Sequence, residues 1–443
     1  MNLHPITRRR LLFGAALAAG ATPLTIGILD AYAGQYPLPV PPAPGPIGGF
    51  DFTRPEILAT RLDTPGSIAF LPDGSALVAQ RDRGTVLRLR PGTAPQRVAA
   101  IAGVPPDGEV GLLGLAISAT FAQDGTVYAY ARGATENRIA RFVLGAPRHQ
   151  RTIFATPTDV HSGGTIATGP DGMLYAAIGD SGDGSDAQDM SSPAGKILRM
   201  RPDGTVPKDN PFAGSLVYSL GHRGVRGLAW DQQGHLFDVE CGDDGGDELN
   251  LVVPGGNYGW PLVDGQGGDS RYRDPILVWP PAEASPGGVA FANGTLFIAA
   301  LRGERLWAVP VDATGQPGTP VSVLDGQFGR LRTVAVAPDG ALWVATSNRD
   351  GSGEATAGDD RIIRIPRVGV PTPVPTASPT ASTTAAPGVA PTAGTTPAAS
   401  PTAAPSPAAI PSPTAIPSPA PTASPSPAAS AAPSPTASPT PQR

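Results

Sequence analysis

The chain has 443 residues, with 32 basic and 37 acidic side chains and a formal net charge of −5. A net charge this small does not point to a nucleic-acid or membrane partner. The single cysteine, Cys241, excludes a disulfide within the chain, so an exported fold would rest on its core or on bound ions.

The N-terminus predicts an export signal. Arginines at 8–10 precede an apolar stretch over 11–29, and the Ala-Tyr-Ala sequence at 31–33 is a small-x-small cleavage site. This order is typical of a bacterial twin-arginine signal peptide. The alternative, an uncleaved anchor helix, is disfavoured because two glycines and a proline interrupt the stretch and no stop-transfer charges follow. We expect residues 1–33 to be a signal peptide and 34–49 a linker. The mature chain then has no membrane span and is periplasmic, cell-wall-associated or extracellular.

One pattern recurs six times between residues 50 and 367. It begins with "GSIAFLPDGSALVAQ" and ends with "TVAVAPDGALWVAT". Each copy is an alternating apolar strand, a turn that ends in glycine, and a second strand, which is the signature of a β-hairpin. The turn glycines are Gly74, Gly125, Gly172, Gly234, Gly294 and Gly340. Their spacing is about that of one four-stranded propeller blade.

These repeats predict an all-β fold, a six-bladed β-propeller over residues 50–367. A hairpin cannot bury both of its faces alone, and closing the repeats into a ring removes most exposed sheet edges. A two-sheet sandwich is the competing all-β interpretation, but it does not explain why the same hairpin returns at this period. The two longest intervals lie between Gly172 and Gly294, so we expect insertions around that part of the ring.

An acidic loop lies between these two glycines. Within the stretch "VECGDDGGDELNLV", residues 239–252, the carboxylates of Asp243, Asp244, Asp247 and Glu248 lie with Cys241 around three glycines. So many negative charges are costly together unless a positive group lies among them. The residues alone leave open a metal loop, a redox site and a solvated turn. An EF-hand is disfavoured because the acids follow a strand and no glutamate closes a twelve-residue loop.

The C-terminal segment, residues 368–443, has a different composition. From residue 368 to 442 it carries no charged side chain and consists almost entirely of Pro, Ala, Thr and Ser. Such a segment has few large apolar side chains to bury and cannot offset the entropy of ordering its backbone. The sequence therefore predicts a disordered, Pro/Ala/Ser/Thr-rich tail that favours extended polyproline II conformations.

An ordered series of motifs across residues 50–367 resembles the soluble quinoprotein glucose/sorbosone (aldose sugar) dehydrogenases. The motifs are "GEVGLLGLA", "HSGG", "GKILRMRPDGTVPKDNPF", "GHRGVRGLAW", "DELN", "NYGWP" and "GRLRTVAVAPDG". Members of that family are six-bladed propellers that oxidise sugars with pyrroloquinoline quinone (PQQ) and calcium. The resemblance implies oxidation of an aldose to its lactone, with the electrons passing on to an electron acceptor.

The resemblance also implies roles for individual residues. It assigns His161 as the base that takes the proton from the anomeric hydroxyl, and Arg223 as a catalytic and cofactor-binding residue on the quinone carbonyls. The further cofactor-binding positions are Gly224, Arg302, Arg330 and Arg332. The implied metal ligands are the carbonyls of Gly242 and Asp243 for the cofactor's calcium, and Glu248 and Tyr258 for a second one. Gln80 matches a substrate position. Without the resemblance, the sequence indicates only that His161 is a loop histidine and that the arginines form ion pairs.

Some residues depart from the family pattern. Gly224 stands where the family usually has asparagine, and Arg226 stands where glutamine is usual. A non-catalytic propeller that binds a glycan or a protein at its channel mouth is therefore the alternative function. A calcium-dependent hydrolase of the lactonase type ranks last, since it needs carboxylates and amides where this chain has basic groups.

Overall fold

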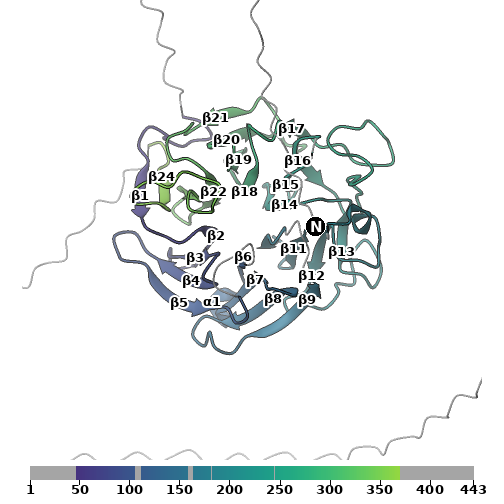
Figure 1. Ribbon diagram of the computed structural model, residues 1–443, viewed down its shortest axis with the longest axis horizontal. Helices are drawn as coiled ribbons and strands as arrows, with labels where there is room; N and C mark the ends of the chain where they lie inside the picture. The colour runs from purple at the N-terminus through teal and green to yellow at the C-terminus, as the bar shows by residue number, and fades with distance from the viewer. Residues whose placement is uncertain (1–45, 105–110, 158–162, 181, 244, 370–443) are drawn as a thin grey trace, which may run out of the picture. The chain divides into compact units, whose positions relative to one another are not determined.

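The computed structural model describes residues 46–104, 111–157, 163–180, 182–243 and 245–369. All of them belong to one compact unit, Met1–Thr376. This region contains six four-stranded antiparallel sheets, which follow one another around a ring as the blades of a β-propeller (Figure 1). The expected fold class is therefore confirmed. No helix in the described part of the chain is long and apolar enough to cross a membrane.

Five blades are built from four consecutive strands, the first of them innermost. Blade 1 contains β2 (Pro65–Phe70), β3 (Ala76–Gln80), β4 (Thr85–Leu89) and β5 (Gln96–Ala100). Blade 2 contains β6 (Gly111–Ile117), β7 (Thr126–Arg132), β8 (Glu136–Val143) and β9 (Arg151–Pro157). Blade 3 contains β10 (Ile166–Thr168), β11 (Leu174–Ile178), β12 (Lys196–Met200) and β13 (Val217–Leu220). Blade 4 contains β14 (Val225–Trp230), β15 (Leu236–Glu240), β16 (Asp247–Val252) and β17 (Leu277–Trp279). Blade 5 contains β18 (Pro286–Ala292), β19 (Thr295–Ala300), β20 (Arg305–Pro310) and β21 (Val321–Val323).

The sixth blade joins the two ends of the described chain. Its inner strands are β22 (Leu331–Val336), β23 (Leu342–Thr346) and β24 (Ile362–Ile365), and its outermost strand is β1 (Glu56–Ala59). Strand β1 pairs antiparallel with β24, with Glu56 opposite Arg364. The same two side chains form an ion pair at 3.0 Å. An N-terminal strand therefore closes the ring.

The six turn glycines occupy the positions for which the repeat predicted them, between the first and second strands of the blades. All six have positive φ, for example 80° at Gly74 and 89° at Gly234. A β-carbon at either of these two positions would meet nothing within 4 Å. Backbone conformation, and not space, is therefore what favours glycine at these two turns. In blade 2 the turn also contains the short helix α1 (Phe121–Asp124).

The hydrophobic core lies between the blades. One buried cluster fills the space between each pair of neighbouring sheets. Between blades 6 and 1, for example, the buried Trp343 meets Phe70 edge to face, with 4.9 Å between the ring centroids. Because each blade buries both of its faces against its neighbours, successive side chains are buried along the second strands, as in β11 and β19.

Candidate functional site

The topology gathers the sequence-predicted residues at one end of the ring. In an antiparallel hairpin, the start of the innermost strand lies beside the end of the second strand. The register of the inner hairpins shows this end, through the pairs Pro65 with Gln80, Val225 with Glu240, Pro286 with Ala300, and Leu331 with Thr346. We call it the cofactor face. The described residues that the sequence assigned to a site and that lie in or next to these strand ends are Gln80, Arg223, Gly224, Gly242, Asp243, Arg302, Arg330 and Arg332.

A cavity of about 590 Å³ runs along the innermost strands. Its walls are mostly small or apolar side chains from β2, β6, β10, β14, β18 and β22. The only charged residues among those that line it in the described part of the chain are Arg81, Arg226 and Arg332. They come from blades 1, 4 and 6. Among the described residues, the charged lining of the channel is therefore entirely positive, which suits an anionic ligand.

Arg223 lies in the turn between β13 and β14, and its side chain is 16% exposed. Its Nη1 donates to the carbonyls of Gly242 at 2.6 Å and Cys241 at 3.2 Å. Its Nη2 pairs with Asp243 at 2.8 Å. The guanidinium also lies 5.3 Å from the ring centroid of Trp260. Arg223 is therefore fixed against the acidic loop by several contacts at once.

These contacts join two parts of the predicted site. The carbonyl of Gly242, assigned from the sequence to calcium, faces a guanidinium in this structure. The carboxylate of Asp243 faces the same group and is itself 56% exposed. The positive charge that the acidic loop needs is thus supplied partly by Arg223. Cys241 contacts the carbonyl of Pro286 through Sγ at 3.5 Å, and burial raises the pKa of its thiol.

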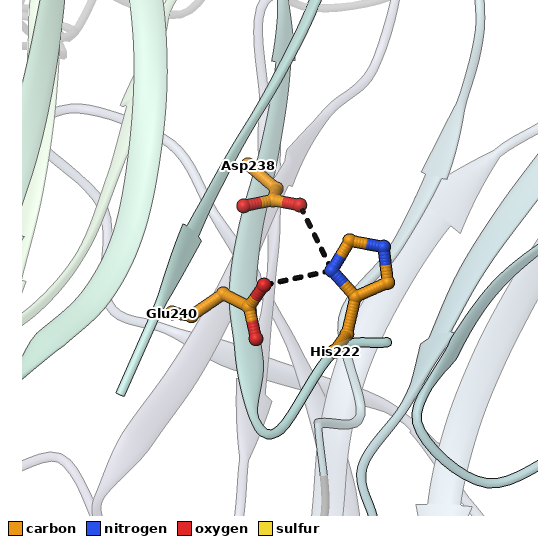
Figure 2. Close-up of side chains that lie close together, drawn as sticks. All are labelled: His222, Asp238 and Glu240. Atoms are coloured by element: carbon orange, nitrogen blue, oxygen red, sulfur yellow. Dashed lines mark hydrogen bonds and ion pairs between the residues drawn. The ribbon is translucent and has the colours of Figure 1, made fainter. Parts of the chain in front are cut away.

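A buried polar network begins at His222, the residue before Arg223, and includes Asp238 and Glu240 (Figure 2). Nδ1 of His222 is 2.7 Å from Glu240 and 3.5 Å from Asp238. The amide of Asn250 donates to Asp238, Glu240 and Glu248. Burial, and secondly the charge of Glu240, raise the pKa of Glu248 to about 8 and raise that of Asp238 well above its usual range. Sequence reasoning assigned only Glu248 from this network. The signal it missed is the alternation of polar residues on β15 and β16.

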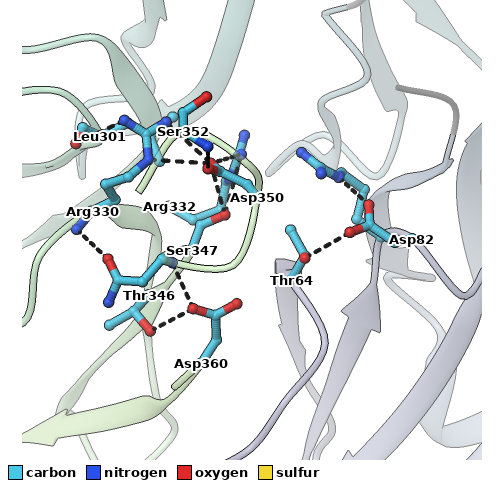
Figure 3. A network of polar contacts seen from close by, with 12 residues as sticks. Thr64, Asp82, Leu301, Arg330, Arg332, Thr346, Ser347, Asp350, Ser352 and Asp360 are labelled. Carbon is cyan, nitrogen blue, oxygen red and sulfur yellow. Dashed lines mark hydrogen bonds and ion pairs between the residues drawn. The ribbon is translucent and has the colours of Figure 1, made fainter. Parts of the chain in front are cut away.

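A second network holds two of the predicted arginines (Figure 3). Asp350, in the turn after β23, accepts hydrogen bonds from Nη2 of Arg330 at 3.1 Å and of Arg332 at 3.0 Å. The hydroxyl of Ser347 donates to the same carboxylate oxygen. Burial opposes ionisation of Asp350, but hydrogen bonds from Ser352 and Arg330 keep the pKa of its carboxyl below the usual value. Burial lowers the pKa of Arg332 to about 10, which leaves it cationic at neutral pH.

The remaining predicted residues have simpler surroundings. Arg302 follows β19 and is exposed. The side-chain carbonyl of Gln80 accepts a hydrogen bond from Thr85 at 2.9 Å. Gly224 has room for a side chain, because the nearest atom to a β-carbon there is 3.6 Å away. Tyr258 donates to the carbonyl of Leu251. The predicted base His161 lies outside the described residues.

The fold and the cationic end of the channel define the class of protein. The family model for Glucose / Sorbosone dehydrogenase matches residues 62–361, and the chain belongs to this family of sugar-oxidising β-propellers. The chain is similar to an aldose sugar dehydrogenase from Streptomyces coelicolor, whose structure was solved in its PQQ-bound form. The two chains are 47% identical over 70% of this chain and 97% of that one, with a TM-score of 0.67.

Two further relatives support the same family. A putative oxidoreductase (glucose dehydrogenase) from Thermus thermophilus is 42% identical over 70% of this chain and 99% of that one, with a TM-score of 0.66. Quinoprotein glucose dehydrogenase B from Acinetobacter calcoaceticus is 29% identical over 315 residues, which are 61% of this chain and 63% of that protein. The recognition of the family from the sequence motifs is confirmed.

Proposed function

We propose that this protein is an exported dehydrogenase that oxidises an aldose at its anomeric carbon to the lactone, with PQQ and calcium. The observation that carries the proposal is the convergence of arginines from separate blades on one end of the channel. PQQ has three carboxylates, and the charged residues that line the cavity in the described part of the chain are all arginines. Two buried nitrogens at this end, Nε of Arg223 and of Arg332, also have no hydrogen-bond partner among the described residues. The donor set therefore fits a polyanionic cofactor.

The arginines have distinct tasks in this proposal. Arg330, Arg332 and the exposed Arg302 bind cofactor carboxylates, since a guanidinium presents a planar fork that stays charged. Arg223 donates to the quinone carbonyls, and Gly224 leaves space beside it. A fixed cation at that point stabilises negative charge that develops during oxidation of the sugar. When bound, PQQ with its calcium supplies the acceptor for the hydride that leaves the anomeric carbon.

His161 is the base of the proposed reaction, and Gln80 contacts the sugar. A histidine has an ordinary pKa near neutrality and can accept the proton of the anomeric hydroxyl. Gly163, two positions later in the chain, lines the channel. The carbonyls of Gly242 and Asp243 hold the cofactor's calcium in this proposal. Calcium prefers oxygen ligands that include main-chain carbonyls.

Glu248 and Tyr258 belong to a second, structural calcium site in this proposal. The buried carboxyl of Glu248 has a raised pKa, so a nearby cation would favour its ionised form. A metal that binds there would therefore release protons near neutral pH. A separate electron acceptor would complete the reaction by taking up the two electrons of the sugar.

The test is reconstitution of the full chain with PQQ and calcium, followed by dye reduction with a panel of aldoses. Turnover that requires both additions supports the proposal. His161→Ala is expected to lower turnover by about a thousandfold, within the range of general base catalysis. His149→Ala is the matched control, since His149 is an exposed histidine away from the cofactor face. Failure of the wild-type protein to bind PQQ would overturn the proposal and favour the non-catalytic propeller.

Export is a separate part of the proposal, carried by the arginines and apolar stretch of residues 1–33. In a bacterial host with a twin-arginine pathway, the mature protein should be recovered outside the cytoplasm. Its first residue should then be near Gly34. Replacing Arg8 and Arg9 by lysine should leave the protein inside the cell, whereas export of that variant would argue against this pathway.

A further inference from the structure

The turn between β13 and β14 carries two residues of the proposed cofactor site, Arg223 and Gly224. Short turns of this kind leave backbone N–H groups without partners in a sheet ladder, and buried N–H groups need acceptors. Here the acceptor is the side chain of Glu240, the last residue of β15. Oε2 of Glu240 accepts from the backbone N–H of Arg223 at 2.9 Å and of Gly224 at 3.2 Å.

The second carboxylate oxygen of Glu240 holds the residue before Arg223. Oε1 lies 2.7 Å from Nδ1 of His222 and accepts from the amide of Asn250 at 3.2 Å. Glu240 is 2% exposed, so its charge is buried and depends on these donors. One carboxylate thus contacts three successive residues of the turn. Strand register brings the carboxylate close to the turn, because Glu240 pairs directly with Val225 at the start of β14.

His222 is fixed on its other side as well. Its Nε2 is 2.8 Å from the hydroxyl of Ser219, and its ring stacks on Tyr258 with 4.7 Å between centroids. The histidine therefore cannot move aside without breaking contacts to blade 3 and to the segment after β16. His222 and the backbone of the turn are thus held in the core. The side chain of Arg223 extends from the turn toward the acidic loop.

His222, Asp238 and Glu240 also have the composition of a metal site, with ligand atoms within 4.8 Å of one another. The contacts favour hydrogen bonding instead. Both oxygens of Glu240 already accept from donors of the protein. The 2.7 Å between Nδ1 of His222 and Oε1 of Glu240 is an ordinary hydrogen-bond distance. The cluster is therefore built to hold the turn in place.

We propose that Glu240 is a positioning residue that sets Arg223 and Gly224 at the cofactor face through their backbone N–H groups. The inference rests on the proposed function for its consequence in cofactor binding. An arginine side chain is long, so a small rotation of its backbone displaces the guanidinium by much more. Altering the groups that orient metal ligands commonly changes affinity by about 10- to 100-fold, and we expect an effect of that order here.

Two variants separate the charge of Glu240 from its reach. Glu240→Gln keeps the length and one acceptor oxygen but loses the charge. Glu240→Asp keeps the charge but is shorter by one methylene. The matched control is Asp238→Asn, two residues earlier on β15, which is equally buried but has no contact with the N–H groups of Arg223 or Gly224. All three variants should unfold cooperatively, which thermal unfolding checks.

The first measurement is amide hydrogen exchange of the protein without cofactor, in a peptide that covers residues 222–226. Exchange should be at least tenfold faster in Glu240→Asp and intermediate in Glu240→Gln. In Asp238→Asn it should match the wild type. Unchanged exchange in both Glu240 variants would overturn the proposal. Equal acceleration in the Asp238 control would also overturn it, because a general loosening of the buried network and not the loss of the two hydrogen bonds would then be the cause.

The second measurement is a PQQ titration in the presence of calcium, in which tryptophan fluorescence reports binding. The dissociation constant should rise about tenfold or more in Glu240→Asp, with a smaller rise in Glu240→Gln and none in Asp238→Asn. The KM for sugar should stay within about twofold of the wild type. Wild-type protein that fails to bind PQQ would overturn the proposed function, whereas hydrogen exchange would still test the role of Glu240. A metal ion that copurifies with the wild type and is lost in Asp238→Asn would overturn the positioning role.

Discussion

Arg332 on β22 donates through Nη2 to the carboxylate of Asp350, in the turn that follows β23, at 3.0 Å. The carboxylate is 3% exposed and also holds Arg330. One buried acid therefore keeps two arginines of the cofactor face in place. Asp350, Arg330 and Arg332 together carry one net positive charge. A polyanionic ligand would meet preorganised donors there.

Asp350→Asn tests this arrangement. Breaking a buried ion pair from one side leaves uncompensated charge, so we expect a loss of about 3 kcal/mol in the free energy of unfolding. Affinity for PQQ should also fall by about tenfold, because Arg330 and Arg332 lose their common anchor. Urea denaturation and cofactor titration measure the two effects. The exposed acid Asp325, which pairs with Arg305, gives the control Asp325→Asn, and equal effects in both variants would contradict the prediction.

Arg223→Lys keeps the positive charge at the cofactor face but loses the planar fork. Lysine cannot reproduce the contacts to two carbonyls, to Asp243 and to the face of Trp260 together. We expect dye-linked turnover of the reconstituted enzyme to fall by about a hundredfold. Arg271→Lys, at a side chain that is 75% exposed, should leave turnover unchanged. Retention of full activity in Arg223→Lys would remove this residue from the proposed mechanism.

Asp360 gives a prediction for pH. Burial raises the pKa of its carboxyl to about 6, from 3.8. The folded protein therefore holds a proton that the unfolded chain releases between about pH 4 and pH 6. Its contribution to stability is complete below pH 4 and is lost as the pH rises through about 6.

The variant Asp360→Asn should remove this dependence. Relative to the wild type, its unfolding midpoint should rise steadily from pH 4 to pH 6.5 and then level off. Asp269 is the contrasting control, since hydrogen bonds from Arg271 lower its pKa to about 2. Asp269→Asn should show no such rise. A constant difference between wild type and Asp360→Asn across this range would show that Asp360 ionises normally.

Phe50 tests the closure of the ring. It is 1% exposed and packs edge to face on Phe297 of blade 5, with 5.1 Å between centroids. Phe50→Ala should cost about 3 to 5 kcal/mol, because it removes a buried ring and leaves a cavity. Urea denaturation provides the measurement. Ile57→Ala on β1, where the side chain is 45% exposed, should cost less than about 1 kcal/mol.

The repeated hairpins could be predicted because their signal is local. A turn glycine and two short apolar strands lie within about fifteen residues of one another, as at Gly74 and Gly234, and positive φ restricts the residue type. The outermost strand of blade 6 could not be predicted in this way. The four residues of β1 have no distinctive pattern, and their partner lies at the other end of the described chain.

The networks around the site escaped prediction for a related reason. Asp350 lies in a turn rich in glycine and serine, where an acid usually faces solvent. Its burial depends on two arginines, 18 and 20 residues earlier in the chain. From the sequence, Glu240 is similarly only the last residue of an expected strand. Its hydrogen bonds to the turn at Arg223 follow from the register of β14 and β15. Long-range partners of this kind have no local sequence signal.

The pairing of β1 with β24 also constrains how this protein can fold. Glu56 and Arg364 are separated by 308 positions, and bringing such distant points together costs about 5 kcal/mol of chain entropy. During synthesis, the first blades can form while the last one still lacks its final strand. The nascent chain therefore carries an open sheet edge until translation has passed residue 365, and the ring is sealed in one late, slow event.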